Sequence, residues 1–260
     1  MTITTMLVHT PLRPISGAIM ALDGLKHATK QDHVVRFIVN GKIDPAILPK
    51  AADYSSFFTL ETRLYDNNIG VPGRMAMEIA DCDTEFVAKH DDDMKLPVNG
   101  WDILLSCMKQ EESIGEKIGG TVMGCQNIEC GILVPDHANK ILRVKRDCHK
   151  KASSGSTSWK LVDYTGTGTS IYKRSVMNEC CFSVKQKLGA GDPDLMWRLT
   201  KAGYRQILCE HPSSEHFHVK CTSDKYEAAR WNNERLIESA KQFYNDHGMV
   251  FEGMLRWSSM

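Results

Sequence analysis

The chain has 260 residues, 42% of them hydrophobic, so it can bury a substantial core as one large α/β domain. Lysine plus arginine and aspartate plus glutamate number 32 each, so the overall charge does not indicate a nucleic-acid, membrane-surface or acidic partner. The nine cysteines form no C-x-x-C pair, and the chain shows neither a secretory leader nor an apolar run near the roughly 20 residues of a membrane span. We therefore expect a soluble protein of the reducing cytoplasm.

The first hundred residues alternate between strand-like and helix-like patterns. We expect strands at 3–9, 34–39, 57–60 and 85–89, and helices at 15–28 and 72–80. Alternation of this kind predicts an α/β fold with a mostly parallel, doubly wound sheet and flanking helices.

The later elements are more varied. We expect a helix at 101–110, a strand-rich middle at 119–144, a mobile Ser/Gly/Thr loop at 153–158, a helix from about 193 and a strand at 206–210. Asp192 could cap the helix that Pro193 opens. The apolar spacing from Tyr226 to Phe243 predicts a C-terminal amphipathic helix packed on the core.

Three consecutive acids, Asp91, Asp92 and Asp93, follow the fourth predicted strand. Ligands of open α/β sheets bind at the carboxyl ends of strands, so these acids lie where chemistry is expected. Adjacent carboxylates repel one another unless a cation compensates them, and Mn²⁺ or Mg²⁺ can link carboxylates to substrate phosphates. The triplet therefore predicts a metal and diphosphate site, with a solvated acidic turn as the alternative.

A second pair of acids, Asp192 and Asp194, lies at the start of the helix near residue 193. A carboxylate there could accept the proton of an attacking hydroxyl, because a helix N-terminus stabilises its charged form. Simple capping of the helix by Asp192 is the alternative.

The order of these features resembles the family-two inverting glycosyltransferases, which have the GT-A fold. Asn68-x-Gly70 with Arg74 is similar to the family's N-x-G segment, and Phe86 to Asp93 is similar to its strand ending in D-x-D. Residues 162–174 resemble the glycine-containing strand entry beside the acceptor pocket. Gly191-Asp192-Pro193-Asp194-Leu195 with Arg198 resembles the E-D-x-D-L-x-x-R element, which contains the catalytic base.

This resemblance implies a role for each matching residue. Asp192 would be the general base, with Asp194 as the second candidate, and Asp91 and Asp93 would contact the metal and the donor diphosphate. Asp92 would meet the donor's sugar or ribose. On the donor side we place Thr10, Arg13, Asn40, Asn68, Arg74, Asp91 and Asp92, and on the acceptor side Trp159, Asp163, Gly166, Gly168 and Arg198.

The sequence departs from the family pattern at three places. Gly191 replaces the first acid of the E-D pair, which leaves the choice of base open, and Lys89-His90 precedes the acids where apolar residues are usual. The second strand ends in Asn40-Gly41, so the nucleobase is also open, although uridine is the family's commonest choice. We expect a single domain, with a donor half at 1–98, an acceptor and catalytic half with a smaller mixed β region at 99–222, and a helical extension at 223–260.

Near the C-terminus, two cysteines and three histidines lie within thirteen residues: Cys209, His211, His216, His218 and Cys221. They could form a zinc site, but their spacing matches no standard finger. The resemblance instead implies that His216 or His218 returns to the active-site metal. The two histidines point the same way in an extended chain, so the choice between them stays open. The alternative is that both lie on the surface and bind no metal.

A basic stretch at 140–151 contains six lysines and arginines and only one acid, Asp147. It could bind a phosphate-bearing acceptor, including DNA, or it could be a solvated loop.

The leading hypothesis is a metal-dependent inverting glycosyltransferase that acts on a glycan, a polysaccharide or another cytoplasmic polymer. The alternatives are a glycosyltransferase that acts on hydroxylated bases in DNA, a nucleotidyltransferase, and a non-catalytic DNA- or glycan-binding module.

Overall fold

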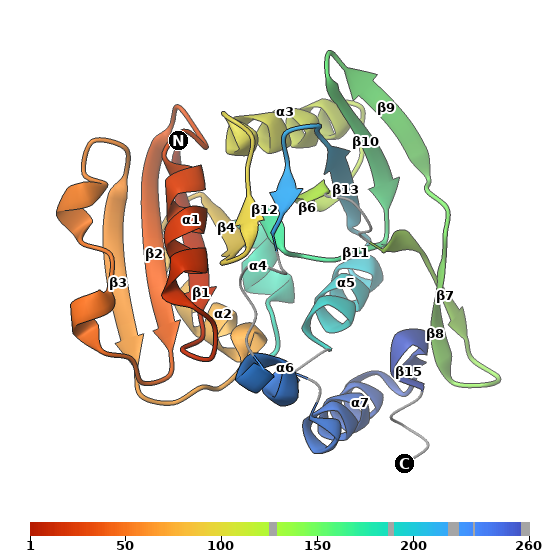
Figure 1. Cartoon of the computed structure of the whole chain (residues 1–260). Helices are drawn as coiled ribbons and strands as arrows, with labels where there is room; N and C mark the ends of the chain where they lie inside the picture. The colour runs from red at the N-terminus through yellow and green to blue at the C-terminus, as the bar shows by residue number, and fades with distance from the viewer. Residues whose placement is uncertain (125–128, 187–189, 218–223, 231, 256–260) are drawn as a thin grey trace.

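The computed structural model describes residues 1–124, 129–186, 190–217, 224–230 and 232–255 (Figure 1). The strands are β1 Thr2–His9, β2 Asp32–Asn40, β3 Thr59–Tyr65, β4 Phe86–Asp91, β5 Met94–Lys95, β6 Ile118–Gly124, β7 Cys130–Asp136, β8 Ile141–Lys145, β9 Lys150–Ser154, β10 Thr157–Val162, β11 Tyr164–Thr165, β12 Thr169–Lys173, β13 Arg205–Glu210, β14 Glu215–His216 and β15 Val250–Phe251. The helices are α1 Ile15–Leu25, α2 Val71–Ala80, α3 Gly100–Ser113, α4 Arg174–Cys180, α5 Gly191–Lys201, α6 Asp224–Arg230 and α7 Asn233–His247. Short 3-10 helices are η1 Pro45–Ile47, η2 Ala51–Asp53 and η4 Glu252–Met254.

The central sheet has nine strands in the order β3-β2-β1-β4-β12-β6-β13-β10-β9. Strands β3, β2, β1 and β4 pair in parallel, whereas β12 is antiparallel to both β4 and β6. Strand β13 is parallel to β6, and β10 and β9 close the sheet as an antiparallel hairpin. Every strand except β12 and β10 therefore points the same way, which confirms the mostly parallel sheet.

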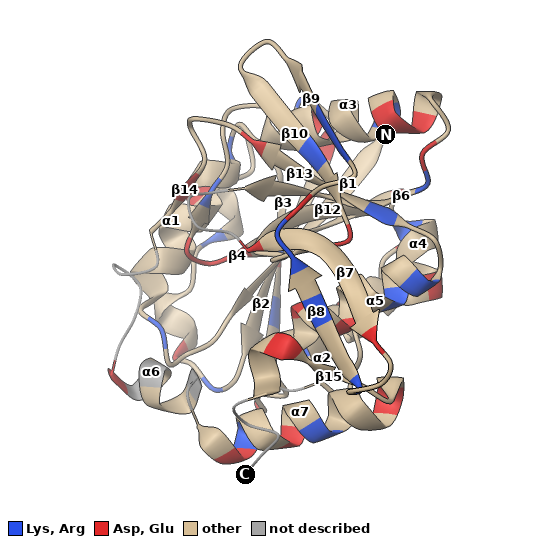
Figure 2. Ribbon diagram, turned by 90° about the vertical axis from the view of Figure 1, so that its right-hand side faces the viewer, with Lys and Arg blue, Asp and Glu red and all other residues tan. Residues whose placement is uncertain are grey.

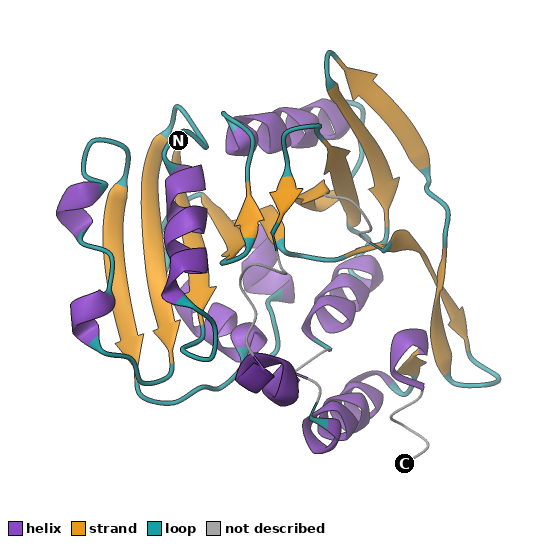
Figure 3. Cartoon of the chain, in the orientation of Figure 1, coloured by secondary structure: helices purple, strands orange, loops and turns teal. Residues whose placement is uncertain are grey.

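Separate hydrophobic cores cover the two faces of this sheet, because alternate residues of a strand point to opposite sides. Ile3 and Leu7 of β1 belong to the core that includes α1 and α3. Met6 of the same strand belongs to the core that includes α2, α4, α5 and α7. Figure 3 shows these helices around the strands, and the arrangement is the doubly wound architecture that the sequence predicts.

A smaller sheet adjoins the second half of the chain. It has the order β11-β7-β8-β15 and mixes parallel and antiparallel pairs, as the predicted mixed β region requires. Figure 1 places its β7–β8 ribbon at the side of the molecule opposite β3. Strand β15 follows α7, so the end of the described chain completes a sheet that starts near residue 130.

The third strand begins later than expected. It starts at Thr59 rather than Phe57, because the backbone N–H of Phe57 donates to the carbonyl of Tyr54 at 2.8 Å and completes a turn. The strand then continues to Tyr65, five residues beyond the predicted end.

Residues 153–158 do not form the expected loop. They lie in the β9–β10 hairpin, where Thr157 pairs with Ser154. Gly155 has a φ of +60° there, a backbone conformation that glycine adopts without steric cost. The small polar residues that suggested a loop are therefore strand residues around one tight turn.

The C-terminal amphipathic pattern forms two helices instead of one. Helix α6 ends at Arg230 and α7 begins at Asn233. Asn232 caps α7, because its side chain accepts a hydrogen bond of 3.0 Å from the backbone N–H of Arg235. Phe243 of α7 is fully buried, so the predicted packing of this segment on the core is confirmed.

Figure 2 shows charged residues of both signs along α7, whereas β8 carries only basic residues. None of the helices in the described ranges combines the length and the apolar character that crossing a bilayer requires.

Candidate active site

Three segments that are distant in sequence meet at the carboxyl end of β4. The backbone N–H of Asp91 donates a 2.8 Å hydrogen bond to the carbonyl of Gly168, just before β12. A Cβ atom on Gly168 would lie 3.4 Å from Oδ2 of Asp91, and one on Gly166 would lie 3.8 Å from Oδ2 of Asp192. The short glycine segment therefore contacts an acid of β4 at one end and an acid of α5 at the other.

Asp92 and Asp93 are held by basic groups of the same sheet edge. Nδ1 of His9, the last residue of β1, lies 2.8 Å from Oδ2 of Asp92, and the guanidinium of Arg13 donates to both acids. Asp92 is only 3% exposed in this state, so its predicted contact with a donor sugar or ribose requires Arg13 to move away. Arg13 therefore faces these two acids. Its Cζ also lies 4.9 Å from the ring centre of Tyr226 in α6.

Lys89 partly compensates the remaining acid of the triplet. Its Nζ lies 2.5 Å from Oδ1 of Asp91 and donates to the carbonyl of Thr167 at 3.1 Å. Desolvation nevertheless raises the pKa of Asp91 to about 6, against the lowering effect of Lys89 and with a further rise from Asp93. The sequence suggested a metal ion as the natural compensator, but in this state Arg13 and Lys89 supply the positive charge.

Asp192 presents its carboxylate at the glycine segment. It accepts hydrogen bonds from the backbone N–H of Thr167 at 3.2 Å and from the hydroxyl of Thr167 at 2.5 Å, and it is partly exposed. It is not the cap of α5, because the helix begins at Gly191 after Ala190, and Pro193 occupies the third position instead of the first. Two neutral donors therefore hold this acid, and its side chain can still be reached.

Asp194 is fully buried and has different partners. Its Oδ2 accepts from Nε of Arg198 at 3.0 Å, and its Oδ1 lies 2.7 Å from Nε2 of His247 in α7. Nδ1 of His247 lies 3.3 Å from the ammonium of Lys201, which can only donate, so Nε2 carries the hydrogen that points to Asp194. Asp194 thus ties α5 to α7, and Arg198 serves this contact instead of the predicted acceptor side.

Gly191 accounts for the missing first acid of the family pair. A Cβ atom at this position would lie 2.5 Å from Cγ of Pro72, at the start of α2. No side chain can enter while the two helices keep this separation. The glycine therefore lets the first turn of α5 approach the first turn of α2.

The predicted donor-side residues outside the acid cluster form one hydrogen-bonded chain. The amide of Asn40 donates to Oδ1 of Asn68 at 3.0 Å, and the amide of Asn68 donates to the hydroxyl of Thr10 at 3.3 Å. Arg74 donates from Nε to Oδ1 of Asn40 at 3.3 Å and stacks with its Cζ 3.5 Å from the ring centre of Tyr65. The chain links the ends of β1 and β2 to the start of α2.

Strand β14 brings a histidine to the acids. His216 pairs with Met94 of β5, and the backbone N–H of Phe217 donates to the carbonyl of Asp93 at 2.9 Å. Nε2 of His216 consequently lies 3.2 Å from Oδ2 of Asp93. His218, the other predicted candidate, lies outside the described residues.

The alternative zinc site finds no support in the described residues. Cys209 is fully buried in the core that includes α3, and Nδ1 of His211 accepts from the backbone N–H of Ser213 at 3.2 Å. Cys221, like His218, lies outside the described residues. Throughout the described ranges, no three His, Cys, Asp or Glu side chains are grouped to hold a metal ion by themselves.

The acid cluster nevertheless fits a hard divalent ion that shares its ligands with a diphosphate. Such an ion commonly takes one or two carboxylates and completes its shell with phosphate oxygens and water. Asp93 and His216 offer an oxygen and a nitrogen 3.2 Å apart, and the carboxylate of Asp91 lies beside the glycine segment at the same end of β4. Asp91, Asp93 and His216 are therefore the residues that could hold it.

Trp159 and Asp163, which we predicted on the acceptor side, are both buried. Trp159 is 2% exposed, and its Nε1 donates to Glu111 of α3 at 2.8 Å. Asp163 accepts from the backbone N–H of Leu133 at 3.0 Å and lies 2.9 Å from Nε2 of His149. Both side chains point into the protein, which sequence order could not reveal because neighbouring strand residues face opposite sides.

The basic stretch at 140–151 is not a continuous cationic surface. Lys140 lies over the ring of Tyr244. Three of the other basic residues have acidic partners: Arg143 with Glu252 at 2.9 Å, Lys145 with Asp147 at 3.0 Å and Lys150 with Glu111 at 2.9 Å. Of the six basic residues in this stretch, only Arg146 and Lys151 form neither an ion pair with an acid nor a contact with an aromatic ring in the described part of the chain.

His9, Thr167 and His247 are site residues that sequence reasoning missed. Each is paired with an acid far away in the chain, so no local spacing signals the contact. The position of His9 at the end of β1 was the one available clue, because β1 and β4 are adjacent parallel strands.

No protein-family model matches the sequence, and no curated protein is a significant match. Similar solved structures include the mannosyltransferase PcManGT from Pyrobaculum calidifontis in complex with GDP-Man and Mn²⁺, at 14% identity and a TM-score of 0.56. They also include S. aureus TarS, at 14% identity and 0.56, and GalNAc-T7 with UDP, GalNAc and Mn²⁺, at 10% identity and 0.57.

These three alignments cover 94%, 94% and 96% of this chain. They cover 63%, 40% and 55% of the other chains, so this chain spans less than two thirds of their length. The sheet order, the helices on both faces and these likenesses together show that the chain has the GT-A fold, the fold of these glycosyltransferases.

Proposed function

We propose that this chain is a metal-dependent inverting glycosyltransferase, which moves a sugar from a nucleotide-sugar donor to an acceptor hydroxyl. The observation that carries the proposal is the glycine segment at 166–168, which contacts Asp91 and Asp192 at its two ends. One acid belongs to a cluster suited to a diphosphate-bound ion, and the other suits a general base. A sugar between them would have its leaving group and its attacking hydroxyl on opposite sides, as inversion requires.

Asp192 is the acid we assign as the base. It is partly exposed and held by the amide and hydroxyl of Thr167, so an acceptor hydroxyl can approach its carboxylate. Asp194 is fully buried and contacts Arg198 and His247, so an acceptor hydroxyl cannot approach it in this arrangement, and we keep it as the second candidate. In the reaction the hydroxyl proton goes to Asp192, the oxygen bonds to the anomeric carbon, and the diphosphate leaves with the electron pair of the broken bond.

The donor nucleotide is assigned to the edge formed by β1, β2 and α2. Thr10, Asn68 and Asn40 form a hydrogen-bonded rim there, which Arg74 fixes from behind. Arg13 would exchange its contacts with Asp92 and Asp93 for the diphosphate oxygens, since a guanidinium binds phosphate as readily as carboxylate. A Mn²⁺ or Mg²⁺ ion at Asp91, Asp93 and His216 would stabilise the negative charge of the leaving diphosphate.

We favour a uridine diphosphate donor. GalNAc-T7, one of the similar structures, is complexed with UDP, and the mannosyltransferase is complexed with GDP-Man, so both nucleotides belong in a first screen. The screen measures the melting temperature with nucleotide diphosphates and nucleotide-sugars, with and without Mn²⁺, because a ligand of the folded state must stabilise it. Stabilisation by no nucleotide would contradict the proposal and favour a non-catalytic binding module.

Asp192→Asn tests the base. Turnover, measured as nucleotide release from the best donor of the screen, should fall by about a thousand-fold or more, while the Kd of the nucleotide with Mn²⁺ stays within about two-fold. Asp23→Asn on α1 is the matched control and should leave turnover unchanged. Preserved turnover in Asp192→Asn would contradict the assignment of Asp192 as the base. In a separate assay of the wild type, release of pyrophosphate from a nucleoside triphosphate would indicate a nucleotidyltransferase.

A further inference from the structure

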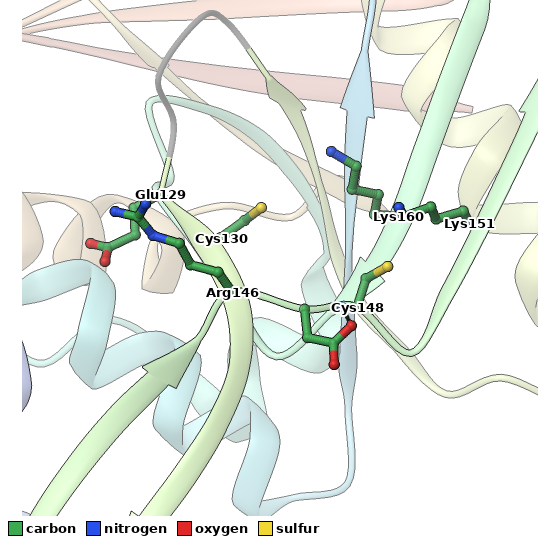
Figure 4. A pocket seen from close by; sticks show the side chains of 7 residues that line it. Glu129, Cys130, Arg146, Cys148, Lys151 and Lys160 are labelled. Carbon is green, nitrogen blue, oxygen red and sulfur yellow. Dashed lines mark hydrogen bonds between the residues drawn. The ribbon is translucent and has the colours of Figure 1, made fainter.

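A cavity of about 510 Å³ lies between the β7–β8 ribbon and the β9–β10 hairpin, outside the donor edge described above. Figure 4 shows its seven lining residues, which come from the start of β7, the β8–β9 connection, β9 and β10: Glu129, Cys130, Arg146, Asp147, Cys148, Lys151 and Lys160. The lining draws on four separate parts of the chain, so only the folded protein forms this cavity.

Cationic groups flank the cavity from two sides. In Figure 4, Arg146 lies on one side and Lys151 and Lys160 on the other, with the two cysteines between them. Arg146 and Lys151 are the two members of the basic stretch that form neither an ion pair nor a ring contact within the described residues, although Lys151 interacts with Asp147 at longer range. Lys160 is paired with Glu210 at 2.7 Å, so it contributes less.

The two acids of the lining do not cancel this charge. Asp147 is already engaged, with Lys145 3.0 Å from one carboxylate oxygen and the backbone N–H of Cys148 2.9 Å from the other. Glu129 is exposed and forms no ion pair within the described residues, so a single unpaired acid faces two unpaired cations.

The floor of the cavity is neutral. Cys130 and Cys148 pack against a small buried cluster of Val122, Val162 and Leu208. Burial raises the pKa of the Cys130 thiol, which keeps it uncharged at neutral pH. A ligand therefore meets an apolar surface between cationic groups, which suits an anion attached to a larger body.

Strand pairing connects this cavity to the candidate base. Cys130 pairs with Thr165 across β7 and β11, and Thr165 is two residues before Thr167, whose hydroxyl binds Asp192. Strands lie about 4.8 Å apart and advance about 3.3 Å per residue, so the cavity is on the order of 10–15 Å from Asp192. One or two sugar units can span such a distance.

We propose that the cavity binds a phosphate ester of the acceptor, with Arg146 and Lys151 as its principal contacts, while the acceptor hydroxyl lies at Asp192. An arginine fork and a lysine from separate segments match the several anionic oxygens of a phosphate. A phosphorylated saccharide fits better than nucleic acid, because the other cations of the stretch are neutralised and leave no track along a polyanion. This inference rests on the proposed transferase function for the role of Asp192.

The test compares two double variants that remove the same charge from the same stretch. Arg146→Gln/Lys151→Gln alters the cavity, and Lys140→Gln/Arg143→Gln, whose cations contact Tyr244 and Glu252 outside the cavity, is the control. Calorimetry measures binding of sucrose phosphate, sucrose and oligodeoxythymidylate, with UDP and Mn²⁺ present in excess to fill the donor edge. All four side chains are at the surface, and circular dichroism checks that both variants remain folded.

We expect the cavity variant to bind sucrose phosphate at least about ten-fold more weakly than the wild type, and the control within about two-fold. Equal losses in the two variants, equal binding of sucrose and sucrose phosphate, or no binding of sucrose phosphate by the wild type would each overturn the proposal. Tighter binding of oligodeoxythymidylate, lost in both variants, would identify a nucleic-acid surface instead. Failure of UDP and Mn²⁺ to bind the wild type would count against the transferase function. This binding is measured in a separate titration, so it is distinguished from a failure to bind sucrose phosphate.

Discussion

The acids at the end of β4 and the acid at the start of α5 are held in different ways. Arg13 and His9 bind Asp92, Arg13 also binds Asp93, and Lys89 binds Asp91, so charged or imidazole groups hold the whole triplet. Among the described residues, Asp192 accepts hydrogen bonds from the amide and hydroxyl of one threonine, and Lys89 acts on it through a longer-range electrostatic interaction. An anion or a metal ion can exchange with the cations of the first region, whereas the second region leaves a carboxylate ready to accept a proton. The proposed diphosphate site and the proposed base therefore lie at opposite ends of one glycine segment.

Asp93→Ala should break the first half of this comparison. It removes the acid that Arg13 and His216 share, so the manganese-dependent stabilisation by UDP should be abolished. Because Arg13 loses one of its two acidic partners and keeps the other, Asp92, a weaker metal-independent binding of UDP should remain. Melting curves with UDP, with and without Mn²⁺, measure both effects.

Asp81→Ala is the control, since this exposed acid lies away from the triplet and pairs with Arg63. If Asp93→Ala kept the full manganese effect, the acid cluster could not be the metal site, whatever the function of Asp192.

His247→Ala should sharpen the second half of the comparison by separating Asp194 from Asp192. The variant leaves Asp194 buried with a single partner, and the loss of one partner of a buried pair costs about 3 kcal/mol of unfolding free energy. Turnover should also fall while the UDP Kd is unchanged, because α5 loses its anchor on α7. Urea denaturation and donor titration measure these effects.

His247→Gln is the matched rescue, since its amide can donate to Asp194 in place of Nε2. Recovery of both stability and turnover would support a positioning role, whereas His137→Ala, at an exposed histidine, should change neither. Unchanged turnover in His247→Ala would show that the Asp194 contact does not position Asp192.

The two regions also differ in how far the sequence predicts them. The donor half alternates strand and helix clearly, and adjacent parallel strands end at one edge, so the grouping of Thr10, Asn40 and the acid triplet follows from chain order alone. Asp192 meets Thr167 across 25 residues and Asp194 meets His247 across 53, and no local pattern encodes such pairs. The expectation that Asp192 caps α5 was wrong for a related reason.

The start of α5 is set by a tertiary contact that outweighs the local capping signal. The sequence Asp192-Pro193 is typical of a cap followed by the first helical residue. The close approach of Gly191 to Pro72 instead lets the helix start two residues earlier, which frees the Asp192 carboxylate for Thr167. A tertiary contact also decides the surroundings of Trp159, because its indole is buried against α3.

Gly191→Ala should move the base without changing any acid. The added methyl group would lie 2.5 Å from Cγ of Pro72, so the two helices must separate, at a cost of about 2 kcal/mol in unfolding free energy. We expect turnover to fall with little change in UDP affinity. Gly24→Ala in α1 is the matched control, because its methyl group would meet nothing closer than 3.6 Å. Equal stability of the two variants would show that the contact with Pro72 is loose.

The smallest predicted effect concerns pH and belongs to the donor half alone. His33 of β2 is buried with Nε2 2.8 Å from the hydroxyl of Thr5, and desolvation lowers its pKa to about 4, against 6.5 in an exposed chain. Between these values the unfolded chain binds a proton that the folded chain does not, so stability falls as the pH drops below about 6.5. Between about pH 7.5 and about pH 5.5 the contribution of His33 is a loss of about 1 kcal/mol. His33→Gln should reduce that loss of stability, and His137→Gln, at an exposed site, should not. An unchanged pH profile of stability in His33→Gln would mean that His33 is protonated in the folded protein. The donor half would then not be the source of this acid sensitivity.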